Sequence, residues 1–418
     1  MTASREFAPA APKGLPSSRS WTGLSLLAGD LLMPCAVIRE SALDANRRFM
    51  AAFLAQSGAL LCPHGKTTMS PELMRQQIAD GAWGITAATW PQARLMHAAG
   101  IRRVLMANQL VGKAELRELS ALLRADPGFA FLALVDSPEL VAHMDGLLDL
   151  PLGARIDVLV EVGQTGARTG ARTLCVALET ARAVATSRQL RLAGIETYEG
   201  ILAGTDAADM RARIDALYAL TQDVARACAD EALFGEDPVI LSGGGSEFFD
   251  RAAAELSAML PGRACRIVLR SGCYLTHDVR WLAAASEAMF ARSPDVAANG
   301  LRPQPALDVW AAIHSRPEPG LAFANMGKRD VSFDMHLPVP QLWFRPGLHD
   351  RPQPLDGVTV RELNDQHTHL VLGSEVDLRI GDLIGFGISH PCTTFDKWTQ
   401  IPVVDDNYRV IRHIHCCF

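Results

Sequence analysis

Residues 59–68 read Ala-Leu-Leu-Cys-Pro-His-Gly-Lys-Thr-Thr, a short apolar run that ends abruptly in a polar turn. The same arrangement recurs along the chain, with further apolar runs at 83–86, 104–107, 130–135, 156–162, 190–196, 238–241 and 266–269. Each run is short and bounded by turn residues, which is typical of buried parallel strands. Stretches rich in Ala, Leu and Arg with helical spacing separate the runs. One of them begins at Ser70-Pro71-Glu72, a cap residue followed by proline at the first helical position.

Eight strand–helix units within about 240 residues match the number and length of a (β/α)8 TIM barrel, which we predict over residues 25–284. A doubly wound open sheet would show the same alternation and is the alternative. From residue 285 to 418 helical patterns fade and alternating runs such as 358–363 and 378–386 predict a mostly antiparallel β domain. Residues 25–38 are either a strand of that domain or the approach to the barrel. Residues 1–24, rich in Ala, Pro and Ser, predict a flexible tail.

Composition narrows the class of protein. The chain has 418 residues, 49% of them hydrophobic, and a net charge of −6, which argues against a nucleic-acid or anionic-membrane surface. No apolar run approaches the ~18 residues of a membrane span, and the first residues show no signal peptide. The nine cysteines are scattered and odd in number. We therefore expect reduced thiols in a cytoplasmic protein without nucleic-acid or membrane partners.

Barrel enzymes place their sites at the carboxyl ends of the strands, and Lys66 follows the first predicted strand. His64, Gly65 and two threonines flank it. Partial burial at such a position favours the free amine that Schiff-base chemistry requires. A surface lysine in a loop is the alternative interpretation.

Two glycine-containing turns follow the seventh and eighth predicted strands. They are Ser242-Gly243-Gly244-Gly245-Ser246 and Ser271-Gly272-Cys273-Tyr274. Glycines let backbone N–H groups approach a phosphate, and barrels often bind phosphate after strands seven and eight. Ordinary turns would look the same. A reactive lysine and a phosphate site in one barrel mouth together indicate pyridoxal phosphate.

His390-Pro391-Cys392 is a candidate metal pair in the β domain. A residue before proline favours an extended conformation, in which residues i and i+2 point to one face. Nitrogen and sulfur ligands suit zinc, and a third ligand would come from His367, His369, substrate or water. An unrelated His and Cys in a loop is the alternative. We interpret the similar His413-Ile-His415-Cys416-Cys417 as a terminal strand.

Several motifs together resemble the D-serine dehydratase/D-threonine aldolase family. They are Pro63–Thr68 with Ser70-Pro71, Gly84–Thr89, and Val162-Gly163 with Arg168–Gly170. Members are fold-type III pyridoxal-phosphate enzymes related to alanine racemase, and the similarity runs from about residue 32 to the C-terminus. The His390–Cys392 pair resembles the zinc site of the dehydratase branch, whereas D-threonine aldolases carry Asp at the position of Cys392. Residues 393–398 resemble the proteins called amino acid deaminases.

The resemblance implies roles for individual residues. Lys66 would bind the cofactor, Tyr198 would lie near its ring, and Arg168 near its phenolic oxygen or the lysine. The resemblance also implies that His64 contacts the cofactor. The residues implied at the cofactor's phosphate are Ser242, Gly243, Gly244, Gly272 and Tyr274. Two departures stand out. Cys273 replaces a common Thr or Asn, and residues 364–367 match the family's acidic residue-His-Gly pattern only loosely.

The resemblance implies a lyase that acts on D-3-hydroxyamino acids with pyridoxal phosphate and Zn²⁺, or alternatively Mn²⁺ or Mg²⁺. Our leading hypothesis is dehydration of D-serine or a relative to a 2-oxo acid and ammonia. The alternative is an aldolase acting on D-threonine or 3-hydroxy-D-aspartate. A non-catalytic pyridoxal-phosphate protein of the same barrel would lack residues 285–418, and a cofactor-free sugar or phosphate barrel is a further alternative. Because Lys66 and the metal pair lie far apart in the chain, we expect a homodimer in which one chain's β domain closes the other's barrel.

Overall fold

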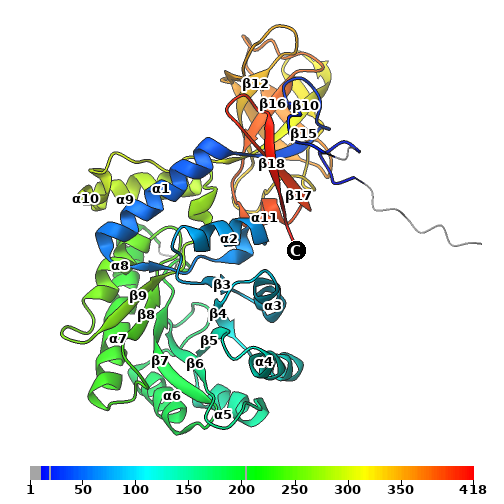
Figure 1. Cartoon of the computed structure of the whole chain (residues 1–418). Coiled ribbons are helices and arrows are strands. Elements are labelled where there is room, and N and C mark those ends of the chain that lie inside the picture. The colour runs from blue at the N-terminus through cyan, green and yellow to red at the C-terminus, as the bar shows by residue number, and fades with distance from the viewer. Residues whose placement is uncertain (1–10, 18–19, 203–204) are drawn as a thin grey trace, which may run out of the picture.

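The computed structural model describes residues 11–17, 20–202 and 205–418. Figure 1 shows a barrel surrounded by helices and, beside it, a second body made of strands. Among the described residues, no helix has the length and apolar character needed to cross a membrane.

The barrel contains eight parallel strands in the order β2-β9-β8-β7-β6-β5-β4-β3. Hydrogen bonds from Trp83 N to Leu61 O and from Thr86 N to Pro63 O join the two ends of this order, so the sheet closes on itself. The strands coincide with the eight predicted apolar runs, and the predicted TIM-like barrel is confirmed. Their bounds are β2 Leu60–Leu61, β3 Ile85–Ala87, β4 Arg103–Gln109, β5 Ala130–Val135, β6 Ile156–Val162, β7 Leu190–Thr197, β8 Val239–Gly243 and β9 Cys265–Leu269.

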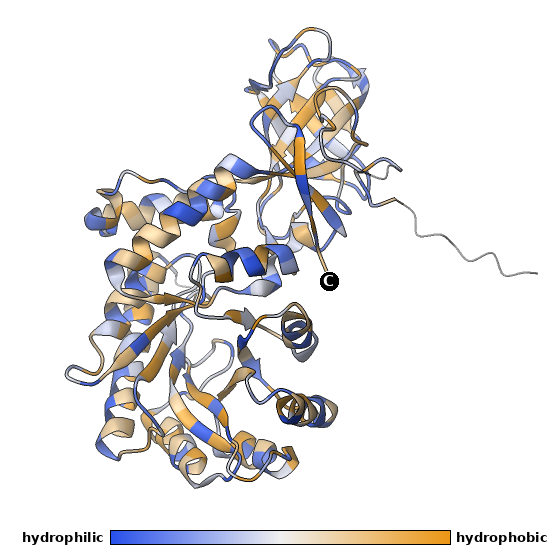
Figure 2. Cartoon of the chain, viewed as in Figure 1, coloured by the Kyte–Doolittle hydropathy of each residue, from blue (hydrophilic) through white to orange (hydrophobic). Residues whose placement is uncertain are grey.

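Helices between the strands cover the outside of the barrel. Figure 2 shows barrel strands that are mostly hydrophobic and helices that alternate between hydrophobic and hydrophilic residues. The Ser70 side chain accepts a hydrogen bond from Leu73 N, as the predicted cap requires. The helices are α2 Pro71–Ala79, α3 Trp90–Ala98, α4 Lys113–Ala125, α5 Pro138–Leu147, α6 Leu174–Thr186, α7 Ala207–Asp230, α8 Phe249–Ser257, α9 Trp281–Arg292 and α10 Pro294–Ala297.

Side chains that alternate along the strands fill the barrel interior. One buried cluster contains Cys62, Leu105, Leu132, Leu134, Leu159, Ile240 and Val268, while neighbouring residues such as Val104 and Met106 pack in the cluster formed with the helices. The interior is therefore a packed core, and the space for a ligand lies at the ends of the strands. Two single turns of 3₁₀ helix lie at those ends, η1 Gly65–Thr67 after β2 and η2 Cys273–Leu275 after β9.

The second sheet has ten strands, all paired antiparallel except β1 with β17. Its main path is β13-β12-β16-β10-β1-β17-β18, and β11, β15 and β14 extend from β10. This confirms the predicted mostly antiparallel β region. The elements are β1 Cys35–Arg39, β10 Leu307–Glu318, β11 Leu321–Ala324, β12 Val339–Phe344, β13 Gln353–Pro354, β14 Val358–Leu363, β15 Thr368–Leu372, β16 Leu383–Gly387, α11 Cys392–Phe395, β17 Gln400–Val404 and β18 Val410–His415.

The N-terminal part of the chain crosses between the two bodies. β1 pairs with β10 and β17, so it is a strand of the second sheet, and α1 Glu40–Ser57 then leads to the barrel. Leu15 is fully buried, and Lys13 pairs with Asp330 at 3.0 Å. Residues 11–17 of the predicted flexible tail thus contact the second body, residues 1–10, 18 and 19 lie outside the described part, and the tail stays a prediction.

Two predicted element boundaries also need correction. The stretch Ser41-Ala42-Leu43-Asp44 predicts a cap ahead of a helix from Ala45, but α1 already begins at Glu40, directly after a strand that fixes the chain direction. The alternating run at 378–386 becomes a strand only from Leu383, because Asp382 instead pairs with Arg345 at 2.9 Å and closes a turn. In both places tertiary contacts set the boundary that local pattern left open.

Candidate active site

A cavity of about 240 Å³ lies at the carboxyl ends of the barrel strands, against the second sheet. At this junction α11 of the second body lies against η1 of the barrel, and β18 lies against α2. The cavity thus receives side chains from both bodies of one chain. It is lined by His64, Lys66, Thr67, Ala88, Ala107, Asn108, Arg168, Tyr198, Gly245, Ser246, Arg270, Gly272, Cys273, Trp281, His390 and Cys392.

Lys66 enters the cavity from η1, directly after the first barrel strand. A Cβ on the preceding Gly65 would lie 2.6 Å from Met96, so this turn packs tightly against the barrel. The Lys66 amine forms no hydrogen bond or ion pair with the described residues. Nearby, His64 Nδ1 is buried and has no hydrogen-bond partner among them. Burial and the charge of Lys66 hold the pKa of His64 well below its usual value, so its ring is neutral.

A charge network lies on the other side of the cavity. Arg270, fully buried, pairs with Glu196 and donates to Ser242 Oγ at 2.8 Å. Burial raises the pKa of Glu196 to about 8. Two guanidinium groups lie near the Tyr198 ring, that of Arg168 5.1 Å and that of Arg270 5.8 Å from its centre. These contacts fix the aromatic ring at the cavity wall.

Four of the residues predicted to bind phosphate do not line the cavity. The Gly244 amide donates to Glu199, Ser242 accepts from Arg270, and the Tyr274 hydroxyl accepts from Gln77 at 3.2 Å. Gly243 is the last residue of β8 and is buried within the barrel. The cavity wall at this place is instead formed by Gly245, Ser246, Gly272 and Cys273.

The residues present fit pyridoxal phosphate. The cavity contains an unpartnered lysine amine, a buried ring nitrogen without a partner at His64, and a tyrosine ring at its wall. At Gly272 a Cβ would lie 2.7 Å from His64 O, so only glycine allows this close approach of two loops. Ser246 and the turn at Gly272 offer donors for a phosphate at the same end. Lys66, His64, Tyr198, Arg168 and Gly272 all lie where the sequence places cofactor residues, and their roles stay predictions.

The second sheet contributes His390 and Cys392 to the cavity. His390 Nδ1 lies 2.6 Å from Asp334 Oδ2, and Thr393 donates to the other oxygen of Asp334 at 2.7 Å. The backbone N–H of His390 donates to Ser332 Oγ at 3.1 Å. Interaction with the Cys392 thiol, and then with Asp334, raises the pKa of His390 to about 9.

Cys392 contacts barrel residues across the junction. Its Sγ lies 3.7 Å from Cys273 Sγ and 3.5 Å from Thr67 Oγ1. The contact with Cys273, and then that with His390, holds the pKa of the Cys392 thiol well below its usual range. The reason we gave for pairing His390 with Cys392 is wrong, because Pro391 is helical (φ −57°, ψ −48°) rather than extended. A tight turn, not strand alternation, brings the two side chains together.

The residues fit a zinc ion in donor chemistry, since an imidazole nitrogen and a thiol face one cavity. Asp334 holds Nδ1 of His390, the arrangement that orients metal-binding histidines. In the described part of the chain, however, no three His, Cys, Asp or Glu side chains are grouped to hold a metal ion as they stand. His367 and His369 do not line the cavity, and His369 instead contacts Asn364 at 2.8 Å.

The C-terminal histidines form part of a strand, as predicted. His413 and His415 belong to β18, where His415 pairs with Glu72 of α2 at 2.7 Å and the His413 ring packs on Trp21 at 5.0 Å. This strand therefore fastens the second sheet to the helix that follows Lys66.

Our reason for expecting a homodimer also changes. We inferred a second chain because Lys66 and the His390–Cys392 pair are distant in sequence. The structure brings all three side chains to one cavity within one chain. A homodimer stays a prediction, but a site shared between chains is not needed to explain these residues.

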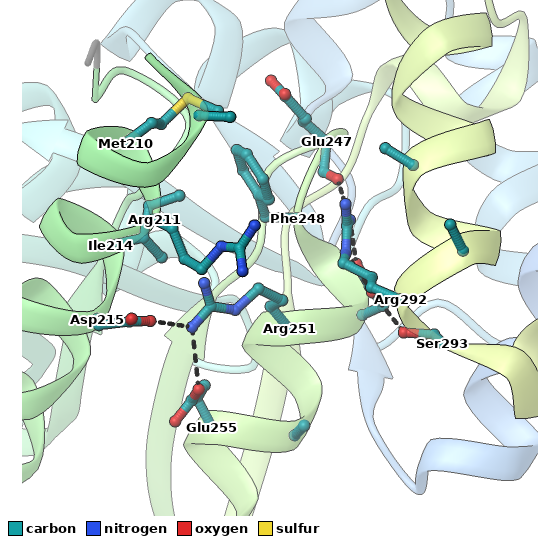
Figure 3. Close-up of a pocket in the computed structure, with 15 residues that line it drawn as sticks. Met210, Arg211, Ile214, Asp215, Glu247, Phe248, Arg251, Glu255, Arg292 and Ser293 are labelled. Carbon is teal, nitrogen blue, oxygen red and sulfur yellow. Dashed lines mark hydrogen bonds and ion pairs between the residues drawn. The ribbon is translucent and has the colours of Figure 1, made fainter. Parts of the chain in front are cut away.

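A larger cavity of about 760 Å³ lies outside the barrel, between α7, α8 and α9 (Figure 3). Two of its arginines are paired with acidic residues of its wall, Arg251 with Asp215 at 2.6 Å and Arg292 with Asp250 at 2.6 Å. None of the residues predicted for the site lines it. The smaller cavity at the barrel mouth is therefore the candidate active site.

Sequence reasoning did not assign roles to Asp334, Trp281 and Arg270. Arg270 follows the eighth strand, so its position was a usable signal, but nothing local shows that it pairs with Glu196. Trp281 lines the cavity from the start of α9. Asp334 lies 56 positions before its partner His390, in a loop without any motif, and only the fold reveals their contact.

The fold resembles that of an alanine racemase-like protein from Idiomarina loihiensis, with a TM-score of 0.67 and 16% identity, covering 92% of this chain and 96% of that one. The chain has a TM-score of 0.73 and 26% identity with the crystal structure of a D-threonine aldolase from Filomicrobium marinum, covering 96% of this chain and 98% of that one. It has a TM-score of 0.71 and 21% identity with D-threo-3-hydroxyaspartate dehydratase from Delftia sp. HT23, covering 94% and 99% of the two chains.

Comparisons of the sequence alone give related matches. Residues 306–404 match the family described as a putative serine dehydratase domain. The chain is also 26% identical to the D-threonine aldolase of Arthrobacter sp. over 383 residues, covering 89% of each chain. The predicted resemblance to the D-serine dehydratase/D-threonine aldolase family is thereby confirmed.

Proposed function

We propose that this protein is a pyridoxal-phosphate- and zinc-dependent lyase that dehydrates a D-3-hydroxyamino acid, D-serine or a close relative, to a 2-oxo acid and ammonia. One observation carries the proposal: the Lys66 amine and the His390–Cys392 pair line the same cavity. A base and an electrophilic site on opposite walls are what elimination of a β-hydroxyl requires.

Lys66 is proposed to hold the cofactor and to move the proton at the substrate α-carbon. Pyridoxal phosphate, when bound, supplies an electron sink for the charge left on that carbon. The tight packing of Gly65 fixes the turn that carries the lysine, so its amine reaches the cavity from one direction only. The neutral His64 ring beside it adds no positive charge that would compete for the substrate carboxylate.

His390 and Cys392 are proposed to hold zinc next to the substrate β-hydroxyl. A zinc ion held by these two residues would supply Lewis-acid polarisation that makes the hydroxyl a better leaving group. Asp334 orients the His390 ring through Nδ1, which leaves the other ring nitrogen free for the metal. A thiolate at position 392 favours zinc, whereas an Asp there would favour manganese or magnesium.

The alternative is an aldolase that breaks the bond between the α- and β-carbons. It is supported by the relatives, since both the Arthrobacter and Filomicrobium proteins are D-threonine aldolases. The cysteine at position 392 favours dehydration, because the aldolases of the family carry Asp at this position.

A product assay distinguishes the two reactions. Purified protein with pyridoxal phosphate and zinc is incubated with D-serine and with D-threonine. We expect 2-oxo acid and ammonia in equal amounts from either substrate that reacts. Glycine plus aldehyde as the main products would overturn dehydration and establish the aldolase.

A further inference from the structure

We propose that Cys273 is a third protein ligand of the metal, so that zinc is held by His390, Cys392 and Cys273 with one position open. The proposal rests on the proposed function in that it assumes a metal at His390 and Cys392. It adds a ligand from the barrel to a pair that comes from the second sheet.

The distance between the two sulfur atoms is the first support. Cys273 Sγ and Cys392 Sγ lie 3.7 Å apart. Two thiolates on one tetrahedral zinc, each at about 2.3 Å from the ion, lie about 3.8 Å apart. The two sulfurs therefore already have the separation that a shared ion imposes. The distance is far beyond the ~2.05 Å of a disulfide, and both cysteines are free.

The surroundings of Cys273 are the second support. The side chain is 8% exposed, and it lines the candidate cavity. Besides Cys392, the thiol contacts Thr67 Oγ1, at a long 3.8 Å, and the Ser246 side chain.

The backbone of Cys273 leaves the thiol free for this task. Its N–H donates to Ser246 Oγ at 3.2 Å, on the side where the glycine-containing turns lie. The backbone can thus serve the phosphate end of the cavity while the thiol faces Cys392. The family commonly has Thr or Asn at this position. The cysteine found here would supply a thiolate ligand to the metal, which neither of those residues could do.

In the described part of the chain no three His, Cys, Asp or Glu side chains already stand in metal-binding positions, so the three donors would have to shift to share one ion. Cys392 is in contact with Cys273 on one side and with His390 on the other. Bound zinc would take the two thiols as thiolates, since metal ligands are bound in their deprotonated forms, and would draw the three donors around one point.

Three protein ligands and one open position are the usual composition of a catalytic zinc site. Because Cys273 belongs to the barrel and the other two ligands to the second sheet, the ion would also join the two walls of the cavity. A substrate hydroxyl would take the open position.

The test is X-ray absorption at the zinc edge of the purified holoenzyme. We expect two sulfur neighbours per zinc in the wild type and one in Cys273→Ser. Zinc affinity, measured by competition with a chromophoric chelator, should weaken in that variant by more than about 100-fold, since even outer-shell partners cost about 10–100-fold. Cys265→Ser, at the far end of β9, is the matched control and should change neither quantity.

Cobalt(II) in place of zinc gives a second readout. The thiolate-to-cobalt absorption of the wild type should fall by roughly half in Cys273→Ser, while the circular dichroism spectrum stays that of the wild type. One sulfur neighbour in wild-type zinc protein would overturn the proposal even if the variant fails to fold. If that result came with ammonia release from D-serine, the third ligand would be wrong and the proposed dehydratase would stand. Two sulfur neighbours per zinc, with glycine and aldehyde as products, would mean that Cys273 is the third ligand but that the proposed dehydratase is wrong.

Discussion

The two walls of the cavity hold their side chains in different ways. On the barrel wall, the Lys66 amine and His64 Nδ1 have no partners among the described residues. On the wall from the second sheet, His390 is held at both its ring and its backbone, by Asp334 and Ser332. The barrel wall therefore offers unsatisfied groups to a ligand, whereas the other wall presents a pair fixed in advance. This difference suits an exchanging organic group on one side and a metal on the other.

Removing the amine from the barrel wall should have the largest effect. Lys66→Ala should lower turnover of D-serine by more than about 10⁴-fold, because the variant loses both the cofactor attachment and the proton-transferring group. Borohydride reduction of the wild type should fix the cofactor to the peptide that contains Lys66. A labelled peptide with any other lysine would show that the barrel wall has a different role.

Removing the metal should abolish the role of the wall from the second sheet and leave cofactor binding at the barrel wall unchanged. A chelator should abolish ammonia release while the yellow colour of the bound cofactor persists, and zinc should restore activity. Cys392→Asp should weaken dehydration and shift the preferred metal towards manganese, because a carboxylate is a harder ligand than a thiolate. Full activity after complete metal removal would contradict the division of labour between the walls.

Loosening the fixed pair should have a smaller effect. Asp334→Asn keeps the shape of the side chain but weakens the contact that orients His390. Zinc affinity should fall by about 10–100-fold with cofactor binding unchanged. Asp365→Asn, an exposed aspartate on the same body that pairs with Arg329, is the control. Equal zinc affinity in both variants would mean that Asp334 does not position the histidine.

The smallest effect concerns the charge network of the barrel wall. Burial raises the pKa of Glu196 to about 8, far above the ~4.3 of an unfolded glutamate. Between these values the folded state holds an extra proton, so stability falls as pH rises, by up to about 1.4 kcal/mol per pH unit. Denaturant titrations between pH 5 and 8 should show a shallower decline in Glu196→Gln. The slope is the readout, since loss of the contact with Arg270 changes the stability at every pH. Parallel slopes in the two proteins would mean that Glu196 titrates normally.

The barrel was predictable because its signal is local and repeated. Eight apolar runs, each followed by a polar turn, specify strands and the side of the barrel that carries the site. Lys66 needed no more than its place after the first run. The contacts between the two walls of the cavity could not be predicted from the sequence. The contact of Cys273 with Cys392 joins residues 119 positions apart and depends on how the second sheet meets the barrel.

Local rules also misled us where long-range contacts dominate. The glycines at 243 and 244 match a phosphate loop, but a buried Glu199 takes the Gly244 amide. His390 precedes a proline, yet the chain turns at Pro391 into α11 and does not extend. No local sequence pattern predicts the contact of Glu199 with Gly244 or the turn at Pro391, because each is fixed by packing between distant segments.

The central claim is that one chain supplies both walls of the cavity. It is tested most directly by mixing two inactive variants, Lys66→Ala and Cys392→Ser, each with its own affinity tag, under conditions that exchange subunits. Ammonia release from D-serine is then measured on material that carries both tags. We expect no recovery, because every barrel with a lysine faces a defective pair on its own chain. If the walls came from different chains, each hybrid dimer would contain one intact site of two, and the doubly tagged material would show about half of wild-type activity. Such recovery would contradict the account.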